Sequence, residues 1–170
     1  MEQTWIFEKL AVSVFGVDFW DPSLADQPDA RERGVRLEVR PVATEHRGSV
    51  YSSPTQTLLP ALCRVDLLES QPGAADRMHW HPEMADGEPG QRVFDVTMPE
   101  DPRGWLRTRM RDLGSLLAGT GQDAQPYAGD MAAVAERADE IVTVADRILA
   151  RARQPWPEVE RDDRGLAPIG

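Results

Sequence analysis

The residues whose side chains could best bind a ligand or take part in a reaction lie at positions 77–88. Two of the three histidines stand there beside a tryptophan and several carboxylates. His79 and His81 are two positions apart, so on an extended backbone their side chains leave the same face. Two imidazoles on one face can converge on a single metal ion. Zinc or iron(II) would need a third ligand, and manganese would favour carboxylates. The stretch predicts a site for a divalent metal (Zn, Fe or Mn) or for a small polar ligand.

The spacing of these residues does not identify the third metal ligand. Acidic residues follow the histidine pair closely, and His46 is the remaining imidazole of the chain. We therefore carry Asp86 and His46 as candidate metal ligands beside His79 and His81. The alternative interpretation is a polar turn in which both histidines make ordinary hydrogen bonds, and that interpretation predicts no bound ion.

The segment 73–86 resembles the first metal-binding motif of the cupin family. That motif consists of a glycine, five residues, His-x-His, three or four residues and a glutamate, and Gly73, His79 and His81 match it. The resemblance implies that the two histidines bind metal, with Asp86 at the position of the glutamate. The match departs from the family because aspartate is shorter than glutamate. No histidine follows His81 to supply the ligand of the second cupin motif, and His46 could replace that ligand only in a different topology.

A second candidate site consists of three arginines. Arg103, Arg107 and Arg111 are spaced by four residues and would share one helical face. Guanidinium groups in this arrangement could bind a carboxylate or phosphate in a bidentate manner. The interpretation we favour is a solvated face whose arginines pair with the many carboxylates of the protein itself.

Nucleophilic catalysis has little support in the sequence. Cys63, the only cysteine, falls on the apolar side of an alternating strand pattern and is predicted to be an inert core thiol. A single cysteine also excludes an internal disulfide, which fits a reducing cytoplasm. Whether the protein is an enzyme is not decided by its sequence.

Charge and composition exclude some classes of partner. The net charge is -10 and the pI is about 4.7, so the chain has no general attraction to nucleic acid or to anionic lipid. The apolar run 10–20 is interrupted by polar residues and is too short to span a bilayer. The first residues lack the positive charge of a secretory signal. We expect a soluble cytoplasmic protein, and the preference for arginine over lysine is typical of a GC-rich bacterial genome.

Strand patterns dominate the first hundred residues. The apolar run 4–20 predicts one or two buried strands, and 34–40 alternates strictly, with Val35, Leu37 and Val39 on one face and charged residues on a wet face. Pro41 is expected to end that strand or to place it at an edge. Further strands are predicted within 55–59, 61–69, 78–81 and 92–98.

Helical patterns follow. Asp101 and Pro102 are typical of a helix start, and apolar residues then recur at helical spacing as far as Leu117. The stretch 131–152 predicts a long amphipathic helix whose apolar stripe includes the small residues Ala138 and Ala145. The segment 154–170 is rich in proline and charge and is predicted to be extended or disordered.

The order of these elements predicts an α+β fold, with an antiparallel sheet of about five strands followed by two C-terminal helices, forming one domain over 1–153. Our first functional hypothesis is a protein that binds a divalent metal or small polar ligand through His79 and His81. The second is a non-catalytic interaction module that forms a homodimer or binds a protein through the 131–152 helix. Packing of that helix within its own chain is the simpler alternative.

Overall fold

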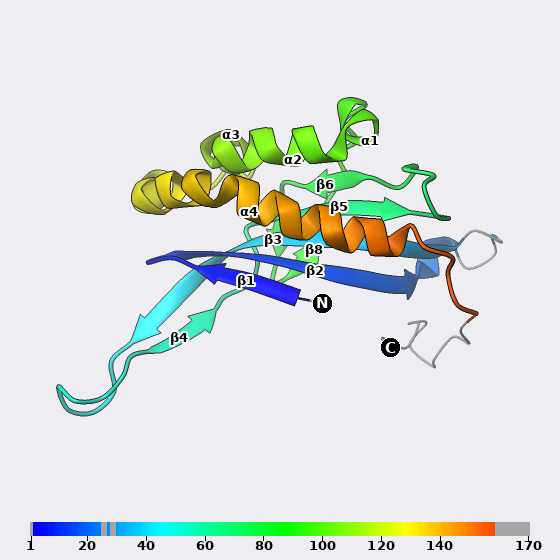
Figure 1. Cartoon of the computed structure of the whole chain (residues 1–170). Helices are drawn as coiled ribbons and strands as arrows, with labels where there is room; N and C mark the ends of the chain where they lie inside the picture. The colour runs from blue at the N-terminus through cyan, green and yellow to red at the C-terminus, as the bar shows by residue number, and fades with distance from the viewer. Residues whose placement is uncertain (1, 25–26, 28–29, 159–170) are drawn as a thin grey trace.

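The computed structural model describes residues 2–24, 27 and 30–158 and has the predicted α+β architecture, with an antiparallel sheet followed by helices (Figure 1). The strands are β1 (Glu2–Ile6), β2 (Leu10–Trp20), β3 (Arg31–Glu45), β4 (Thr55–Leu58), β5 (Cys63–Glu69), β6 (His79–His81), β7 (Met84–Ala85) and β8 (Glu88–Pro89). The helices are α1 (Thr97–Glu100), α2 (Pro102–Arg111), α3 (Leu113–Ala118) and α4 (Ala128–Ala152). Short 3-10 turns cover Pro22–Leu24 and Gln125–Tyr127.

The main sheet has the strand order β1-β2-β3-β5-β6, with β4 paired to β3 and every pairing antiparallel. The prediction that Pro41 would end a strand or put it at an edge was wrong, because β3 continues through this residue to Glu45. Pro41 lies where β3 changes partner: its pairing with β5 ends at Val39, and its pairing with β4 begins at Val42. A residue without an N–H is tolerated at such a change of partner.

The two faces of the sheet differ in chemistry, but in β3 and β5 both faces carry buried residues. Val35, Leu37 and Val39 of β3 belong to the apolar core beneath the helices, as their alternation predicts. The opposite face was expected to be wet, yet Glu38 is only 2% exposed. Arg40 and Arg64 both pair with its carboxylate. Charged residues therefore occupy this face as buried ion pairs.

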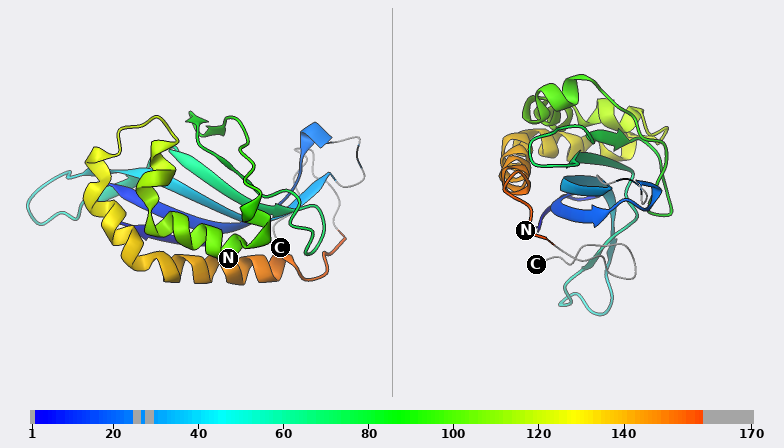
Figure 2. Two further views of the ribbon diagram at one scale, coloured as in Figure 1. Left: turned by 90° about the horizontal axis from the view of Figure 1, so that it is seen from above. Right: turned by 90° about the vertical axis from the view of Figure 1, so that its right-hand side faces the viewer.

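The long helix α4 crosses one face of the sheet, with α2 and α3 beside it (Figures 1 and 2). Its predicted stripe is buried against β2, β3 and α2 within the same chain. Ile148 lies so close to Gly16 of β2 that a Cβ at Gly16 would stand 3.2 Å from it. The face that we considered as a dimer seam is thus already occupied by the protein's own core.

The remaining helical region differs from its prediction in two places. The expected single helix from 101 is divided, because the Asp112 side chain accepts a hydrogen bond from Ser115 N and starts α3 as a new helix. The predicted strand at 92–98 was wrong: Val93 forms an isolated bridge to Trp80, and α1 begins at Thr97. Asp95 accepts hydrogen bonds from the backbone and hydroxyl of Thr97, which favours a turn over an extended chain.

The end of the described chain is attached to the sheet. Trp156 Nε1 donates a hydrogen bond to Ala152 O at 2.5 Å, and the Arg31 guanidinium lies over the Trp156 ring. The rest of the predicted proline-rich tail, 159–170, lies outside the described residues. Within the part of the chain that is described, no helix combines the length and apolar character needed to cross a membrane.

Asp130 joins the start of α4 to the turn between β1 and β2. Its Oδ2 atom accepts hydrogen bonds from the backbone N–H groups of Lys9 and Leu10, each at 2.6 Å. Leu10 is fully buried, so removal of the carboxylate takes away the hydrogen-bond acceptor of a buried N–H group. An unsatisfied buried donor costs more than the net value of the bond that it lost.

We expect Asp130→Ala to lower the free energy of unfolding by about 3 kcal/mol, measured by urea denaturation. Asp146→Ala is the matched control on the same helix, because Asp146 is half-exposed and makes a 3.9 Å ion pair with Arg103. That control should change stability by no more than about 0.5 kcal/mol. Equal effects of the two substitutions would show that Asp130 does not anchor the β1–β2 turn.

Candidate metal centre

Three side chains converge on the polar face of the sheet, at the pairing of β5 with β6. Asp66 of β5 stands directly opposite His79 of β6, and Arg64 stands opposite His81. Residues opposite one another in an antiparallel pair point to the same face, and so do residues two apart on one strand. Asp66, His79 and His81 therefore share one face, and each is at most 3% exposed.

The distances between these side chains fit shared coordination of one ion. The Nε2 atoms of His79 and His81 lie 3.1 Å apart. Asp66 Oδ2 lies 3.6 Å from His79 Nε2 and 3.7 Å from His81 Nε2. Metal–ligand bonds of about 2.1 Å place neighbouring ligand atoms about 3.0 Å apart at right angles and about 3.4 Å apart in a tetrahedron. The observed separations are close to this range.

The hydrogen bond made by Nδ1 of each imidazole determines whether the Nε2 atom, which faces the other two side chains, carries a proton or a lone pair. His79 Nδ1 lies 2.8 Å from Arg77 O, and His81 Nδ1 lies 3.0 Å from Gly90 O. A carbonyl oxygen only accepts, so each Nδ1 carries the proton and donates it. In the neutral imidazole the Nε2 atom then bears a lone pair. Such a hydrogen bond from the outer N–H to a backbone carbonyl is the usual support of a metal-bound histidine.

Burial keeps both imidazoles neutral. It lowers the pKa of His79 to about 4, although the bond to Arg77 O and the Asp66 carboxylate act in the opposite direction. Burial likewise lowers the pKa of His81. At neutral pH, two nitrogen lone pairs and a carboxylate oxygen therefore face one another.

Arg36 holds the carboxylate of Asp66 in place from β3. Its Nε donates to Asp66 Oδ1 at 2.7 Å, and its Nη2 donates to Oδ2 at 3.2 Å. Each carboxylate oxygen has two lone pairs, so Oδ2 can accept this bond and still bind a cation. The arginine also balances a charge that would be costly to bury alone.

A pocket of about 470 Å³ opens beside the group, and we call it the polar-face pocket. Its lining includes Asp66, His79, His81, Glu32, Arg92 and Glu88. The side chains that could hold an ion therefore face a space that could hold a small molecule. Arg92 lies in this lining with its Nη2 atom 2.9 Å from Asp21 Oδ2.

Glu32 is a second buried carboxylate in the polar-face pocket. It is fully buried, and neither of its oxygens has a hydrogen-bond partner among the described residues. Arg92 Nη1 lies 4.0 Å from Oε1, at the outer limit of an ion pair. Burial raises the pKa of Glu32 to about 7, against the lowering effect of Arg92.

The structure brings together only part of the predicted ligand set. His79 and His81 lie as expected, but the described residues place Asp66, rather than Asp86 or His46, in the group with them. Asp86 is exposed in the turn between β7 and β8, with a φ of 51°. His46 is exposed just beyond the end of β3. Asp66 was overlooked because its link to the histidines depends on strand pairing.

The predicted arginine site has the ordinary explanation that we favoured. Arg107 and Arg111 each donate a hydrogen bond at 2.9 Å to Asp139 of α4. Arg103 lies 3.9 Å from Asp146 of the same helix. The three guanidiniums thus attach α2 to α4 across the surface, and their charges are balanced by the protein's own carboxylates.

Cys63 is fully buried, in agreement with the prediction of a core thiol. Burial raises its pKa to about 12, with a smaller contribution from Glu38. A thiol with so high a pKa carries almost no thiolate at neutral pH, and the thiolate is the reactive form. The cysteine therefore has a packing role.

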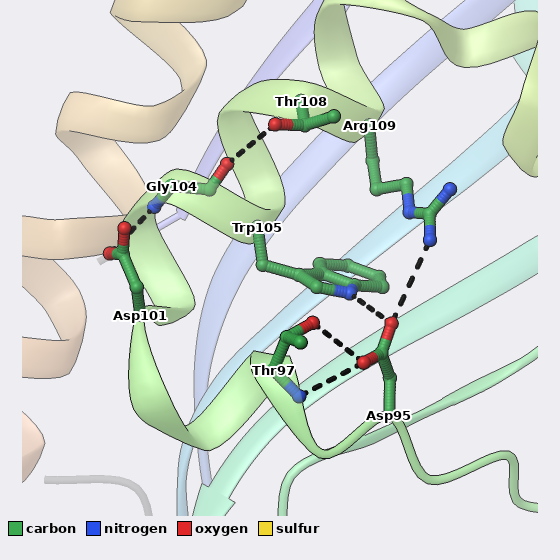
Figure 3. Close-up of a pocket in the computed structure, with 7 residues that line it drawn as sticks. All are labelled: Asp95, Thr97, Asp101, Gly104, Trp105, Thr108 and Arg109. Carbon is green, nitrogen blue, oxygen red and sulfur yellow. Dashed lines mark hydrogen bonds and ion pairs between the residues drawn. The ribbon is translucent and has the colours of Figure 1, made fainter.

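A separate pocket lies beside α1 and α2, and its polar groups bond to one another (Figure 3). Asp95 accepts hydrogen bonds from Thr97 and from Trp105 Nε1, and Arg109 lies 3.7 Å from the same carboxylate. The Thr97 and Trp105 bonds hold the pKa of Asp95 below its ordinary value. This carboxylate is well satisfied, in contrast to Glu32.

The pKa of Glu32 leads to a prediction about pH. The folded-state pKa is raised, so Glu32 contributes stability below about pH 4.5, and this contribution is lost as the pH rises through about 7. Glu32→Gln should match the wild type near pH 4 and exceed its free energy of unfolding by on the order of 3 kcal/mol near pH 8. Urea denaturation in the presence of a chelator measures the difference.

The matched control is Glu88→Gln, because Glu88 lines the same pocket but is exposed. Its stability difference from the wild type should stay near zero across the same pH range. If Glu32→Gln were equally offset from the wild type at both ends of the range, the carboxylate would not be in a desolvated position.

The comparisons of this chain with known proteins found no match. No protein-family model matches the chain, and neither a curated protein nor a solved structure matches it. The convergence of Asp66, His79 and His81 on one face of the sheet is therefore the observation from which the function is inferred.

Proposed function

We propose that the protein binds a divalent transition-metal ion through Asp66 Oδ2, His79 Nε2 and His81 Nε2. The observation that carries this proposal is the 3.1 Å separation of the two Nε2 atoms. Both atoms bear lone pairs, since both Nδ1 atoms donate to backbone carbonyls. Two lone pairs and a carboxylate oxygen repel one another at such distances, and a cation placed between them converts the repulsion into attraction.

Burial strengthens this argument. The three ligand residues are at most 3% exposed, so water screens their mutual repulsion poorly. A surface cluster of the same composition could be relieved by solvent and counterions. The Arg36 guanidinium donates hydrogen bonds to both oxygens of Asp66 and balances its charge, but it carries no acceptor and so adds no further lone pair to the group.

The ligand set indicates the class of ion. Two imidazoles with one carboxylate occur in catalytic zinc sites and in non-haem iron(II) sites, whereas magnesium and calcium prefer oxygen ligands. Three protein ligands leave at least one coordination position for water or for a substrate. The polar-face pocket adjoins the group, so a molecule in that pocket has access to such a position.

The chemistry that follows is metal-assisted chemistry on a small molecule. A divalent ion at this position would polarise an oxygen of the bound molecule or lower the pKa of bound water. Arg36 keeps Asp66 oriented, and the backbone carbonyls of Arg77 and Gly90 keep the two imidazoles oriented. A rigid set of ligands of this kind is what a catalytic metal site requires.

Metal binding can be measured directly. Protein purified without chelator should contain about one divalent transition-metal ion per chain by elemental analysis, and the metal-free protein should bind Zn²⁺ in a calorimetric titration. His79→Ala and Asp66→Asn should each lower the Zn²⁺ affinity by more than the roughly 10- to 100-fold typical of changes outside the ligand set. Bound Zn²⁺ should also raise the unfolding midpoint.

His46→Ala is the matched control, because it removes the exposed histidine that lies outside the group. Its Zn²⁺ affinity should equal that of the wild type. A wild-type protein that binds no Zn²⁺, Fe²⁺ or Mn²⁺, or an affinity that survives Asp66→Asn and His79→Ala in folded protein, would refute the proposed metal site.

A further inference from the structure

The polar-face pocket has two chemically different ends. One end holds Asp66, His79 and His81. Glu32 lies four residues before Arg36 on β3, and Arg36 stands opposite Asp66, so Glu32 forms a separate end beside Arg92 and Asp21. Glu32 is not among the described residues that could share an ion with the histidines. It therefore offers a second point of attachment to whatever occupies the pocket.

Glu32 lacks a hydrogen-bond donor although it is fully buried. Neither Oε1 nor Oε2 has a partner among the described residues, whereas the large majority of buried polar side-chain atoms in proteins are hydrogen-bonded. Burying a carboxylate in this way is costly. Because these carboxylate oxygens lie in the wall of a pocket, we take a bound ligand as the source of the missing hydrogen-bond donor.

The arginines of the pocket do not supply this donor, because each is engaged with another carboxylate. Arg36 pairs with Asp66 at 2.7 Å, and Arg64 pairs with Glu38 at 2.8 Å. Arg92 donates to Asp21 at 2.9 Å and comes no closer than 4.0 Å to Glu32.

The charges at the Glu32 end favour a cationic group. Asp21 balances Arg92, and its pKa is held below the ordinary value by Ser23 and Arg92 despite its burial. Glu32 is then the carboxyl group that remains without a hydrogen-bond donor among the described residues, and the charges of Arg92 and Arg77 offset only part of the effect of burial on its pKa. A protonated amine supplies both the missing hydrogen bonds and the opposite charge.

We propose that the polar-face pocket binds a small molecule that carries a protonated amine against Glu32 and an oxygen ligand for the metal at the other end. This assignment rests on the proposed metal site and adds the class of ligand to it. Selectivity would come from the two ends together, since a buried carboxylate without its donor penalises molecules that lack the amine.

Matched hydroxamic acids test the assignment, because the hydroxamate group binds the metal and the chain carries the variable end. One series ends in an ammonium group, a second ends in methyl, and a third ends in carboxylate, each over a range of short chain lengths. In Zn²⁺-loaded wild-type protein, we expect the ammonium compound of suitable length to bind at least about tenfold more tightly than its methyl partner.

Glu32→Gln should abolish this preference while leaving the affinity for the methyl compound and for Zn²⁺ unchanged. Glu32→Asp, which retains the charge, should keep part of the preference. The matched control Asp86→Asn removes an exposed carboxylate of the β7–β8 turn that does not line the pocket, and it should keep all of the preference. Normal Zn²⁺ binding by each variant shows that it is folded.

The two proposals fail in different ways. A flat Zn²⁺ titration would overturn the metal site and this assignment with it. Normal Zn²⁺ binding without an ammonium preference at any chain length would overturn this assignment alone. So would a preference that survives in Glu32→Gln, or tighter binding of the carboxylate series, which would mean that Arg92 governs this end of the pocket.

Discussion

The pairing of β5 with β6 is the constraint on which the candidate site depends. Three residue pairs define the register, and it places Asp66 opposite His79. A shift of one residue would turn both histidines to the other face, into the apolar core beneath the helices. Backbone hydrogen bonding, rather than any contact among the three side chains, therefore decides that two imidazoles and a carboxylate meet.

Burial of the polar face gives this pairing its chemical consequence. The helices cover one face of the sheet, and the opposite face carries Glu38, Asp66 and the histidines at 3% exposure or less. Buried charges must be balanced, and most of these are, by Arg36, Arg40 and Arg64. The exceptions stand out against that background. They are the lone pairs that face one another at His79 and His81, and the carboxylate of Glu32.

Much of the architecture was predictable because local patterns agree with the tertiary environment. The alternation in β3 and β5 identified the core-facing residues, and the stripe on α4 identified a buried helix face. Asp101 and Pro102 correctly marked the start of α2. The errors at Pro41 and at 92–98 arose where a change of strand partner and the Asp95 turn overrode local propensity.

For the site, the spacing of His79 and His81 was enough to predict that both side chains lie on one face, since a spacing of two on an extended backbone is a local property. The acidic character of the chain and the core position of Cys63 were likewise predictable from composition and local alternation. The identity of the third side chain, in contrast, follows from the pairing of β5 with β6. Asp66 lies thirteen residues before His79, and neither spacing nor composition links them.

Asp86 fits the short motif but lies in an exposed turn. Its closeness to the histidines in the sequence does not place its side chain beside them, because the β7–β8 hairpin leads the chain away. The position of Glu32 in the same pocket likewise depends on how β3 is brought alongside β5, a pairing that forms only when the sheet does.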